Sequence, residues 1–206
     1  MAFPTTDSPG ELQAVNQILA SVGQAPVTTL EQTNPDVAIA YNTLLQVSRE
    51  VQAEGWTFNK EYHYPLTPNS DGEIVIPDNM LQIDLCMNEY YNRDKDPIRR
   101  DGKLYDRIAH SYKWKQRIHY FDITWLFNWD DLPPVIKDYI TSRAAVFVSQ
   151  RTVGDPNQYQ ALQQQEVYMR AMALEYETQQ GDYTFFGHPE GGNYYNSYQP
   201  FHALYR

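Results

Sequence analysis

Pairs of acidic residues are the first feature of this sequence that could perform chemistry. Asp130 and Asp131 are adjacent, and Asp71 lies two residues before Glu73. Two carboxyl groups flanking a sugar linkage are the catalytic pair of most glycoside hydrolases. Tryptophans that could stack sugar rings are also present, namely Trp114, Trp125 and Trp129. A structural explanation is favoured for these residues, because acids stabilise helix N-termini and tryptophans fill cores and interfaces. A glycan-binding or glycan-hydrolysing protein therefore stays open as the alternative function.

Other local signatures of catalysis are missing from the sequence. It has no Gly-x-Ser-x-Gly motif, no Gly-x-x-x-x-Gly-Lys-Ser/Thr phosphate loop and no His-Glu-x-x-His zinc motif. Its five histidines are scattered, and its one cysteine, Cys86, offers no partner for a disulfide or for a cysteine-based zinc site. We therefore expect no enzyme activity, no cofactor and no metal.

The charge of the chain is strongly negative, at -10, and unevenly distributed. Residues 89–117 contain nine basic and five acidic side chains, whereas the remainder contains seven basic and 21 acidic ones. Because nucleic-acid binding requires neutralising phosphates with Lys and Arg, a protein that grips DNA is disfavoured. The basic segment either contacts an acidic partner or forms a solvated hairpin in which Arg and Lys alternate with Asp. No apolar run approaches the roughly 20 residues that span a bilayer, so we expect no membrane partner.

Two helices are predicted near the N-terminus. Residues 8–11 (SPGE) have the pattern of a capping box with proline at the first helical position, and Gly23 ends the first helix. Asn34 and Pro35 start a second helix, which Gly55 ends. Apolar residues at steps of three and four give each helix one buried face.

The middle of the chain is predicted to be β-structure. β-branched and aromatic residues concentrate in segments 73–76, 80–87 and 117–127, which Pro, Asn, Asp and Gly separate. The dipeptide Asp101-Gly102 suits a type I′ turn, because both central residues of that turn need positive φ. We therefore expect a hairpin centred on this dipeptide.

Helical periodicity returns near residue 130. Acids and prolines at residues 130–134 start a third helix, and Gly154 followed by Asp155-Pro156 separates it from a fourth. The fourth helix carries a predicted contact stripe at steps of three and four, made of Leu162, Gln165, Met169, Met172 and Tyr176.

The order of these elements is helix pair, β segment, helix pair and tail. A lone amphipathic pair leaves its apolar stripes uncovered, so the two pairs most simply close into one bundle. We predict an α+β fold in which a discontinuous four-helix bundle domain (1–56 and 129–180) carries an inserted antiparallel β domain (57–128). Residues 181–206 form an extended C-terminal arm whose many aromatic residues suit a protein surface better than solvent.

Five short motifs occur in a distinctive order. Residues 18–31 (ILASVGQAPVTTLE) are followed by residues 55–59 (GWTFN), residues 102–107 (GKLYDR), an acidic-Leu-Pro segment at 130–133 and residues 151–156. Together they resemble the tail tubular protein A family, the head-to-tail adaptors of short-tailed bacteriophages with tubular tails. The resemblance spans most of the chain, but the tail from Gly181 onward departs from the family pattern.

The resemblance implies a structural virion protein that forms a dodecameric ring. One rim would bind the portal protein and the other the tubular tail nozzle protein, with the tail fibre protein docked near the second junction. DNA would pass through the lumen without specific binding, because an acidic lining repels phosphates. The protein would lie in the virion tail after assembly in the host cytoplasm.

Two sets of residues carry these expectations. By the resemblance, the scaffold motif consists of Gly23, Pro26, Leu30, Gly55, Trp56, Phe58 and Asn59. Contacts with other proteins are expected from the basic hairpin and the aromatic arm, that is from Arg99, Arg100, Lys103, Arg107, Tyr194, Tyr195, Tyr198, Phe201 and Tyr205.

Overall fold

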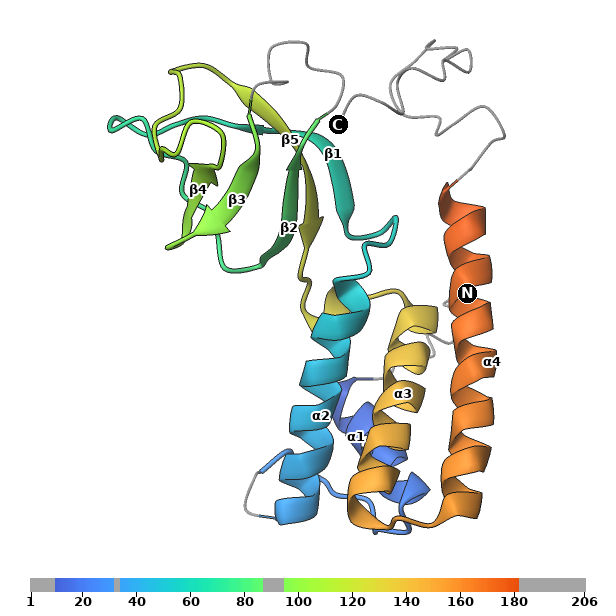
Figure 1. Cartoon of the computed structure of the whole chain (residues 1–206). Helices are drawn as coiled ribbons and strands as arrows, with labels where there is room; N and C mark the ends of the chain where they lie inside the picture. Colours follow the sequence, from blue (N-terminus) through green and yellow to red (C-terminus); the bar gives the residue numbers. More distant parts are fainter. Residues whose placement is uncertain (1–9, 32–33, 87–94, 182–206) are drawn as a thin grey trace, which may run out of the picture.

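The computed structural model describes residues 10–31, 34–86 and 95–181 (Figure 1). These residues form an α+β structure with four α-helices and two small antiparallel sheets, which confirms the predicted class. The helices come from the two ends of the described chain and the strands from its middle. None of the described helices is both long and apolar enough to span a membrane.

The first helix, α1 (Glu11–Ser21), starts two residues later than predicted, with Gly10 at the N-cap. Ser8 and Pro9 of the expected capping box lie outside the described residues. Its end is as predicted, because Gly23 adopts a φ of 77° and its N–H closes the last turn at 3.1 Å. Glycine adopts this left-handed conformation without the steric cost that a Cβ imposes.

The second helix, α2 (Pro35–Gln52), begins at the predicted signal. The side chain of Asn34 accepts a hydrogen bond from the backbone N–H of Asp36 at 3.0 Å, and Pro35 occupies the first turn. Gly55, with a φ of 79°, ends the segment. The cap and the stop are therefore both local, which explains why the sequence identified them.

The loop between these helices holds two of the scaffold residues, Pro26 and Leu30. The side chain of Asn16 donates to the carbonyl of Val27 at 2.9 Å and accepts from its N–H at 2.7 Å. Leu30 is partly buried against the helical core. These contacts fasten the loop to α1, so the proline-containing turn has a fixed position.

The third helix starts later than the sequence predicted. Residues Trp129–Asp131 form a 3-10 turn, and α3 (Pro134–Thr152) begins only at Pro134. The acids at 130 and 131 therefore precede the helix instead of lying in its first turn. α3 contacts α1, α2 and α4, and it is buried around most of its circumference.

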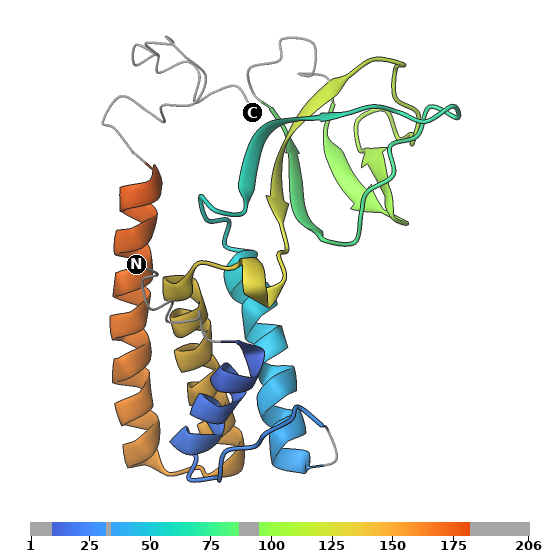
Figure 2. The same cartoon turned by 180° about the vertical axis from the view of Figure 1, so that it is seen from behind.

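The fourth helix, α4 (Pro156–Gly181), runs alongside α3 (Figures 1 and 2). Its predicted stripe was partly right. Leu162, Met169 and Tyr176 are partly buried, whereas Gln165 and Met172 are exposed. Because α4 packs mainly against one neighbouring helix, its contact row is narrower than the sequence pattern suggested.

All four helices contribute to one hydrophobic core. Its fully buried members include Ile18 of α1, Leu44 of α2, Tyr139 of α3 and Ala173 of α4. Phe58, a scaffold residue at the start of the β region, packs against this core and stacks near Phe127 with ring centroids 6.3 Å apart. Helices distant in sequence therefore share one buried interior.

The larger sheet contains β1 (Lys60–Leu66), β5 (His119–Trp125) and β2 (Met80–Leu85), in that spatial order. Both pairings are antiparallel. The segments predicted at 80–87 and 117–127 thus contain the strands β2 and β5, with Met87 outside the described residues, but β1 was not predicted separately. The segment predicted at 73–76 is not a strand, because it pairs only through an isolated bridge between Val75 and Lys103.

The smaller sheet is the predicted hairpin, β3 (Pro97–Arg100) and β4 (Lys103–Asp106). Asp101 and Gly102 both have positive φ, 53° and 69°. This is the geometry of a type I′ turn, so the prediction from the dipeptide is confirmed. A second core lies between the two sheets and includes Leu104, Trp114 and Phe121.

The helices and the sheets meet at Asn59, which is completely buried. Its Oδ1 accepts from the backbone N–H of Trp56 at 2.8 Å, and its Nδ2 donates to the carbonyls of Gln52 at 2.8 Å and Trp125 at 2.7 Å. The backbone N–H of Trp125 in turn donates to the carbonyl of Asn59 at 2.8 Å. One side chain therefore ties the end of α2 to the end of β5.

Two neighbours complete this junction. The buried side chain of Gln52 accepts from the N–H of Phe127 at 2.8 Å and donates to its carbonyl at 3.2 Å. The indole N–H of Trp56 donates to the carbonyl of Val51 at 2.7 Å, and its ring meets that of Tyr139 edge-on. Through these contacts, residues 55–59 join the helices to the larger sheet.

Replacing Asn59 by Asp tests this joint. The substitution keeps the shape but removes both donated hydrogen bonds and places a carboxylate against two carbonyls. Since each buried polar group left unpaired costs about 1–3 kcal/mol, we expect a loss of about 3 kcal/mol in the free energy of unfolding. Chemical denaturation measures it, with Asn42→Asp on the exposed side of α2 as a control expected to change stability by less than about 0.5 kcal/mol. Equal stability of the two variants would contradict the role of Asn59.

Candidate functional site

The four predicted basic residues lie together on and just after the β3–β4 hairpin. Arg99 donates to Oδ1 of Asp78 at 2.9 Å and to the carbonyl of Met80 at 3.2 Å. Lys103 donates to Oε2 of Glu73 at 2.7 Å. This hydrogen bond raises the pKa of Lys103 and lowers the pKa of Glu73.

The other two bases also have partners within the chain. The guanidinium of Arg100 lies over the ring of Tyr105, 4.1 Å from its centroid. Arg107 pairs with the carboxylate of Asp96. Exposed ion pairs of this kind contribute about 0–1 kcal/mol each, so a carboxylate of another protein can replace the internal partner at little cost. The hairpin is therefore a locally balanced surface instead of an unopposed positive patch.

The carboxylate of Asp106, at the base of the hairpin, is held in place by hydrogen bonds. The carboxylate of Asp106 is completely buried and accepts from Lys95 Nζ at 3.0 Å and from the backbone N–H groups of Asp96 at 3.3 Å and Ile108 at 3.0 Å. Burial by itself would raise the pKa of Asp106, but these donors outweigh it and hold the pKa below its ordinary value. Asp106 therefore orders the chain on both sides of the hairpin.

The aromatic half of the predicted contact set cannot be placed. Tyr194, Tyr195, Tyr198, Phe201 and Tyr205 all lie outside the described residues. Their expected role in contacts between proteins stays a prediction.

The fold buries the tryptophans considered for sugar chemistry and pairs Glu73, whereas the three aspartates considered with them are exposed. Glu73 binds Lys103, and Asp130 and Asp131 lie in the 3-10 turn. Trp114, Trp125 and Trp129 are all at least 91% buried within the two cores. Since none of these three indoles is available to stack on a sugar, the structure offers no support for the glycan alternative at these residues.

A surface that the sequence reasoning missed lies on the side of α4 that points away from α3. We define the outer face of α4 by Gln164, Val167, Tyr168, Ala171 and Leu174, which lie within about a third of the helix circumference. Val167, Tyr168 and Leu174 are 65%, 62% and 48% exposed. The face carries no charge from residue 164 to residue 174, although the chain as a whole is 20% charged, and the exposed Glu175 follows directly on the same side. In the sequence, the feature that could have indicated an uncharged surface on this helix was the run from residue 156 to residue 165, which contains no charged residue.

A similar surface lies on α2. We define the outer face of α2 by Ala38, Ile39, Asn42, Leu45 and Gln46, of which Ile39 and Leu45 are exposed by 38% and 41%. This face is also uncharged from residue 38 to residue 46, and the exposed Arg49 follows on the same side. An exposed helix face normally carries charged residues, so two uncharged faces with aliphatic side chains are typical of contact surfaces.

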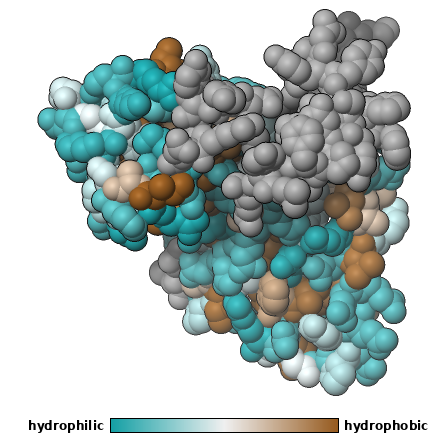
Figure 3. Space-filling view, turned by 45° about the horizontal axis from the view of Figure 1, so that its top comes forward, coloured by the Kyte–Doolittle hydropathy of each residue, from teal (hydrophilic) through white to brown (hydrophobic). Residues whose placement is uncertain are grey.

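Each outer face contains a shallow hollow. Ala38, Ile39, Asn42 and Arg151 contribute to the first, and Gln160, Gln164 and Val167 contribute to the second. Apolar residues interrupt the hydrophilic surface of the helical part in Figure 3, on the side where α4 lies, whereas the β part is mainly hydrophilic. Neither hollow holds a cluster of titratable groups, so these surfaces suit packing better than catalysis.

Two comparisons with known proteins agree with one another. The family model described as tail tubular protein matches residues 12–183. The chain is also similar to tail tubular protein A of Klebsiella phage KP34, with 26% identity over 165 residues, which cover 80% of this chain and 84% of that protein.

The buried charge of Asp106 predicts a pH dependence. Because its pKa is lower in the folded chain than in the unfolded chain, its stabilising effect is complete above the ordinary Asp pKa of about 3.9 and is lost as the pH falls through the folded value. We expect Asp106→Asn to lose about 2 kcal/mol of stability at pH 7 and to show a flatter stability curve below about pH 5. Urea denaturation across this pH range is the measurement.

Asp78→Asn is the matched control, since Asp78 pairs with Arg99 on the same hairpin but its side chain is fully exposed. Its stability should stay within about 0.5 kcal/mol of the parent. If the stability of the Asp106→Asn variant fell with decreasing pH as steeply as that of the parent, the stabilising role of the buried carboxylate would be contradicted.

Proposed function

This chain belongs to the tail tubular protein family of structural phage tail components, and from that premise we propose that it is the adaptor ring between the portal and the tubular tail nozzle. The observation that supports this proposal is the pair of uncharged outer faces on α2 and α4. Its mechanism is shape and contact between subunits, without catalysis.

The two outer faces lie on opposite flanks of the helical part. α2 and α4 run in the same direction, with α1 and α3 between them (Figures 1 and 2). Placing a second copy beside the first therefore brings the outer face of its α2 against the outer face of α4. This is a heterologous contact, which generates a closed ring when the rotation between copies divides a full turn.

The chemistry of the two faces is complementary. Val167 and Tyr168 project from α4, while Ile39 and Arg151 border a hollow on α2. Beyond the uncharged faces, the exposed residue Arg49 lies near the C-terminal end of α2 and the exposed Glu175 lies near that of α4. Opposite charges at corresponding ends of two parallel helices favour this pairing over pairing between two copies of one face.

We propose that the helices form one discontinuous bundle domain (1–56 and 129–180) that builds the ring wall, with twelve copies as in the family. The β domain (57–128) extends beyond one end of this wall (Figure 1). The hairpin with Arg99, Arg100, Lys103 and Arg107 would then lie at one rim, where the portal, the nozzle or a fibre protein docks. The fold class and the family membership support this arrangement.

The net charge of -10 supports a passive conduit. An acidic lining repels the phosphate backbone, so DNA moves through the lumen without being held. A complex with duplex DNA that weakens steeply with added salt would contradict this part of the proposal.

Replacing Val167 by Glu tests the ring contact. The substitution places a charge at the centre of the outer face of α4, so we expect the ring population to fall by at least about tenfold at a given protein concentration, a change of about 1.4 kcal/mol in the contact. Native mass measurement of the protein, alone and with the portal protein of the same phage, reports the number of copies. Val75→Glu is the matched control, because Val75 is 61% exposed on the β part, away from both outer faces.

The two parts of the proposal fail differently. Rings of the Val167 variant equal to those of the parent would overturn the α2–α4 contact and leave the adaptor function intact. A parent protein that stays monomeric with and without the portal would overturn the adaptor function itself.

A second test concerns the arm, whose aromatic residues we propose to lie on a neighbouring subunit. Deleting residues 182–206 should leave the thermal unfolding of the monomer within a few degrees of the parent and weaken ring formation, because large aromatic side chains supply much contact area at low entropic cost. A shortened protein that assembles and binds the portal like the parent would contradict this role. A large fall in monomer stability would instead place the arm on its own subunit.

A further inference from the structure

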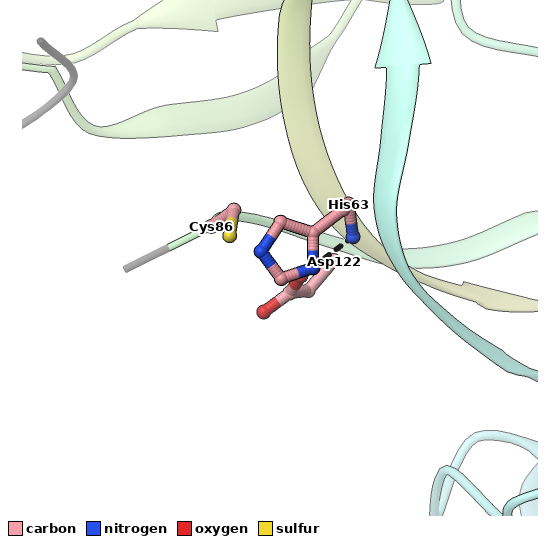
Figure 4. Close-up of side chains that lie close together, drawn as sticks. All are labelled: His63, Cys86 and Asp122. Atoms are coloured by element: carbon pink, nitrogen blue, oxygen red, sulfur yellow. Dashed lines mark hydrogen bonds between the residues drawn. The ribbon is translucent and has the colours of Figure 1, made fainter. Parts of the chain in front are cut away.

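Three side chains with metal-binding chemistry converge on the larger sheet. His63, Cys86 and Asp122 each offer one ligand atom, and these atoms all lie within 4.8 Å of one another. Figure 4 shows the three side chains gathered at one place on the sheet. The three residues are distant in sequence, so only the pairing of the strands brings them together.

The sheet fixes the position of each residue. Asp122 lies on the central strand β5, with β1 on one side and β2 on the other. His63 lies at an irregularity in the β1–β5 register, where its φ is 57°, and its N–H donates to Oδ1 of Asp122 at 3.2 Å. Cys86 directly follows β2 and is tied to β5, because its N–H donates to the carbonyl of Tyr120 at 3.4 Å. The backbone positions of all three residues are therefore tied to the strand β5.

A fourth residue adds an independent observation. Asp84 on β2 is paired directly with Asp122 on β5. Like charges opposite one another on neighbouring strands are destabilising. A bound cation at this position removes the repulsion, and it also compensates the charge that a buried thiolate would carry at Cys86, which is 97% buried.

We propose that His63, Cys86 and Asp122 bind one divalent metal ion of the zinc class. Sulfur, imidazole nitrogen and carboxylate oxygen are the three ligand types that zinc combines in proteins. The ligand atoms of a tetrahedral zinc site lie about 3.3–3.8 Å from one another. The ligand atoms of His63, Cys86 and Asp122 lie within 4.8 Å of one another, so binding the ion would shorten the longest of these distances by about 1 Å. Rotation of the exposed His63 side chain supplies this contraction, and a water molecule occupies the fourth position.

The site extends the structural function of the sheet. A metal held by β1, by β5 and by the residue after β2 clamps the three strands at the same level. Binding requires loss of the thiol proton from Cys86, so the affinity rises with pH until that proton is gone. The clamp is independent of the adaptor function, because its ligands lie on neither outer face.

Cobalt substitution tests the site directly. Untagged protein prepared without metal is titrated with Co²⁺, which gives a thiolate-to-cobalt absorption band in the near ultraviolet when a cysteine is a ligand. We expect one Co²⁺ per chain, displaced by Zn²⁺, and an increase in Tm with Zn²⁺. Cys86→Ser should lose the band, and His63→Asn and Asp122→Asn should weaken Zn²⁺ binding by at least about tenfold.

His110→Asn is the matched control. His110 is likewise exposed and has a positive φ of 51°, a conformation that asparagine tolerates, but it lies outside the cluster. It should bind Co²⁺ like the parent. Absence of the band in the parent, or an unchanged affinity in the His63 variant, would overturn the proposal even where the Cys86 variant fails to fold.

Discussion

The buried amides of Asn59 and Gln52 are the constraint on which the rest of the structure depends. They satisfy backbone groups of α2, of the segment after it and of the end of β5, which would otherwise be unpaired in a dry interior. A buried polar network of this kind is stabilising only when every member has a partner. It therefore specifies one orientation of the helices relative to the sheets, where an apolar contact would permit several.

That fixed orientation gives the two parts of the chain different roles. The helical part exposes two uncharged faces on opposite flanks, which suit repeated contacts between copies. The β part carries paired charges on a hairpin that extends to one end, which suits exchange of ion pairs with another protein. A rigid joint at Asn59 keeps the hairpins of neighbouring copies at the same height, so the proposed ring has a regular rim.

Features set by a few neighbouring residues were predictable. The cap at Asn34, the helix stops at Gly23 and Gly55 and the turn at Asp101-Gly102 depend on local backbone conformation, and the structure confirms all four. The fourth helix was predicted less well, because the width of its buried row depends on how many helices surround it. The uncharged face of α4 was visible as a run of glutamines and apolar residues, but a run does not reveal which side points outward.

The sequence by itself determined the class of the fold, the order of its elements and the family, because caps, turns and periodicity are local and the family motifs are short. Tertiary structure alone decided that Asn59 is a buried joint, that the hairpin bases are already paired and that Val167 and Tyr168 point outward. It also brought together His63, Cys86 and Asp122, which are too far apart in the sequence for a shared helix or a single loop to place them side by side. Such groupings depend on strand register and helix packing, which arise from contacts between residues far apart in the chain.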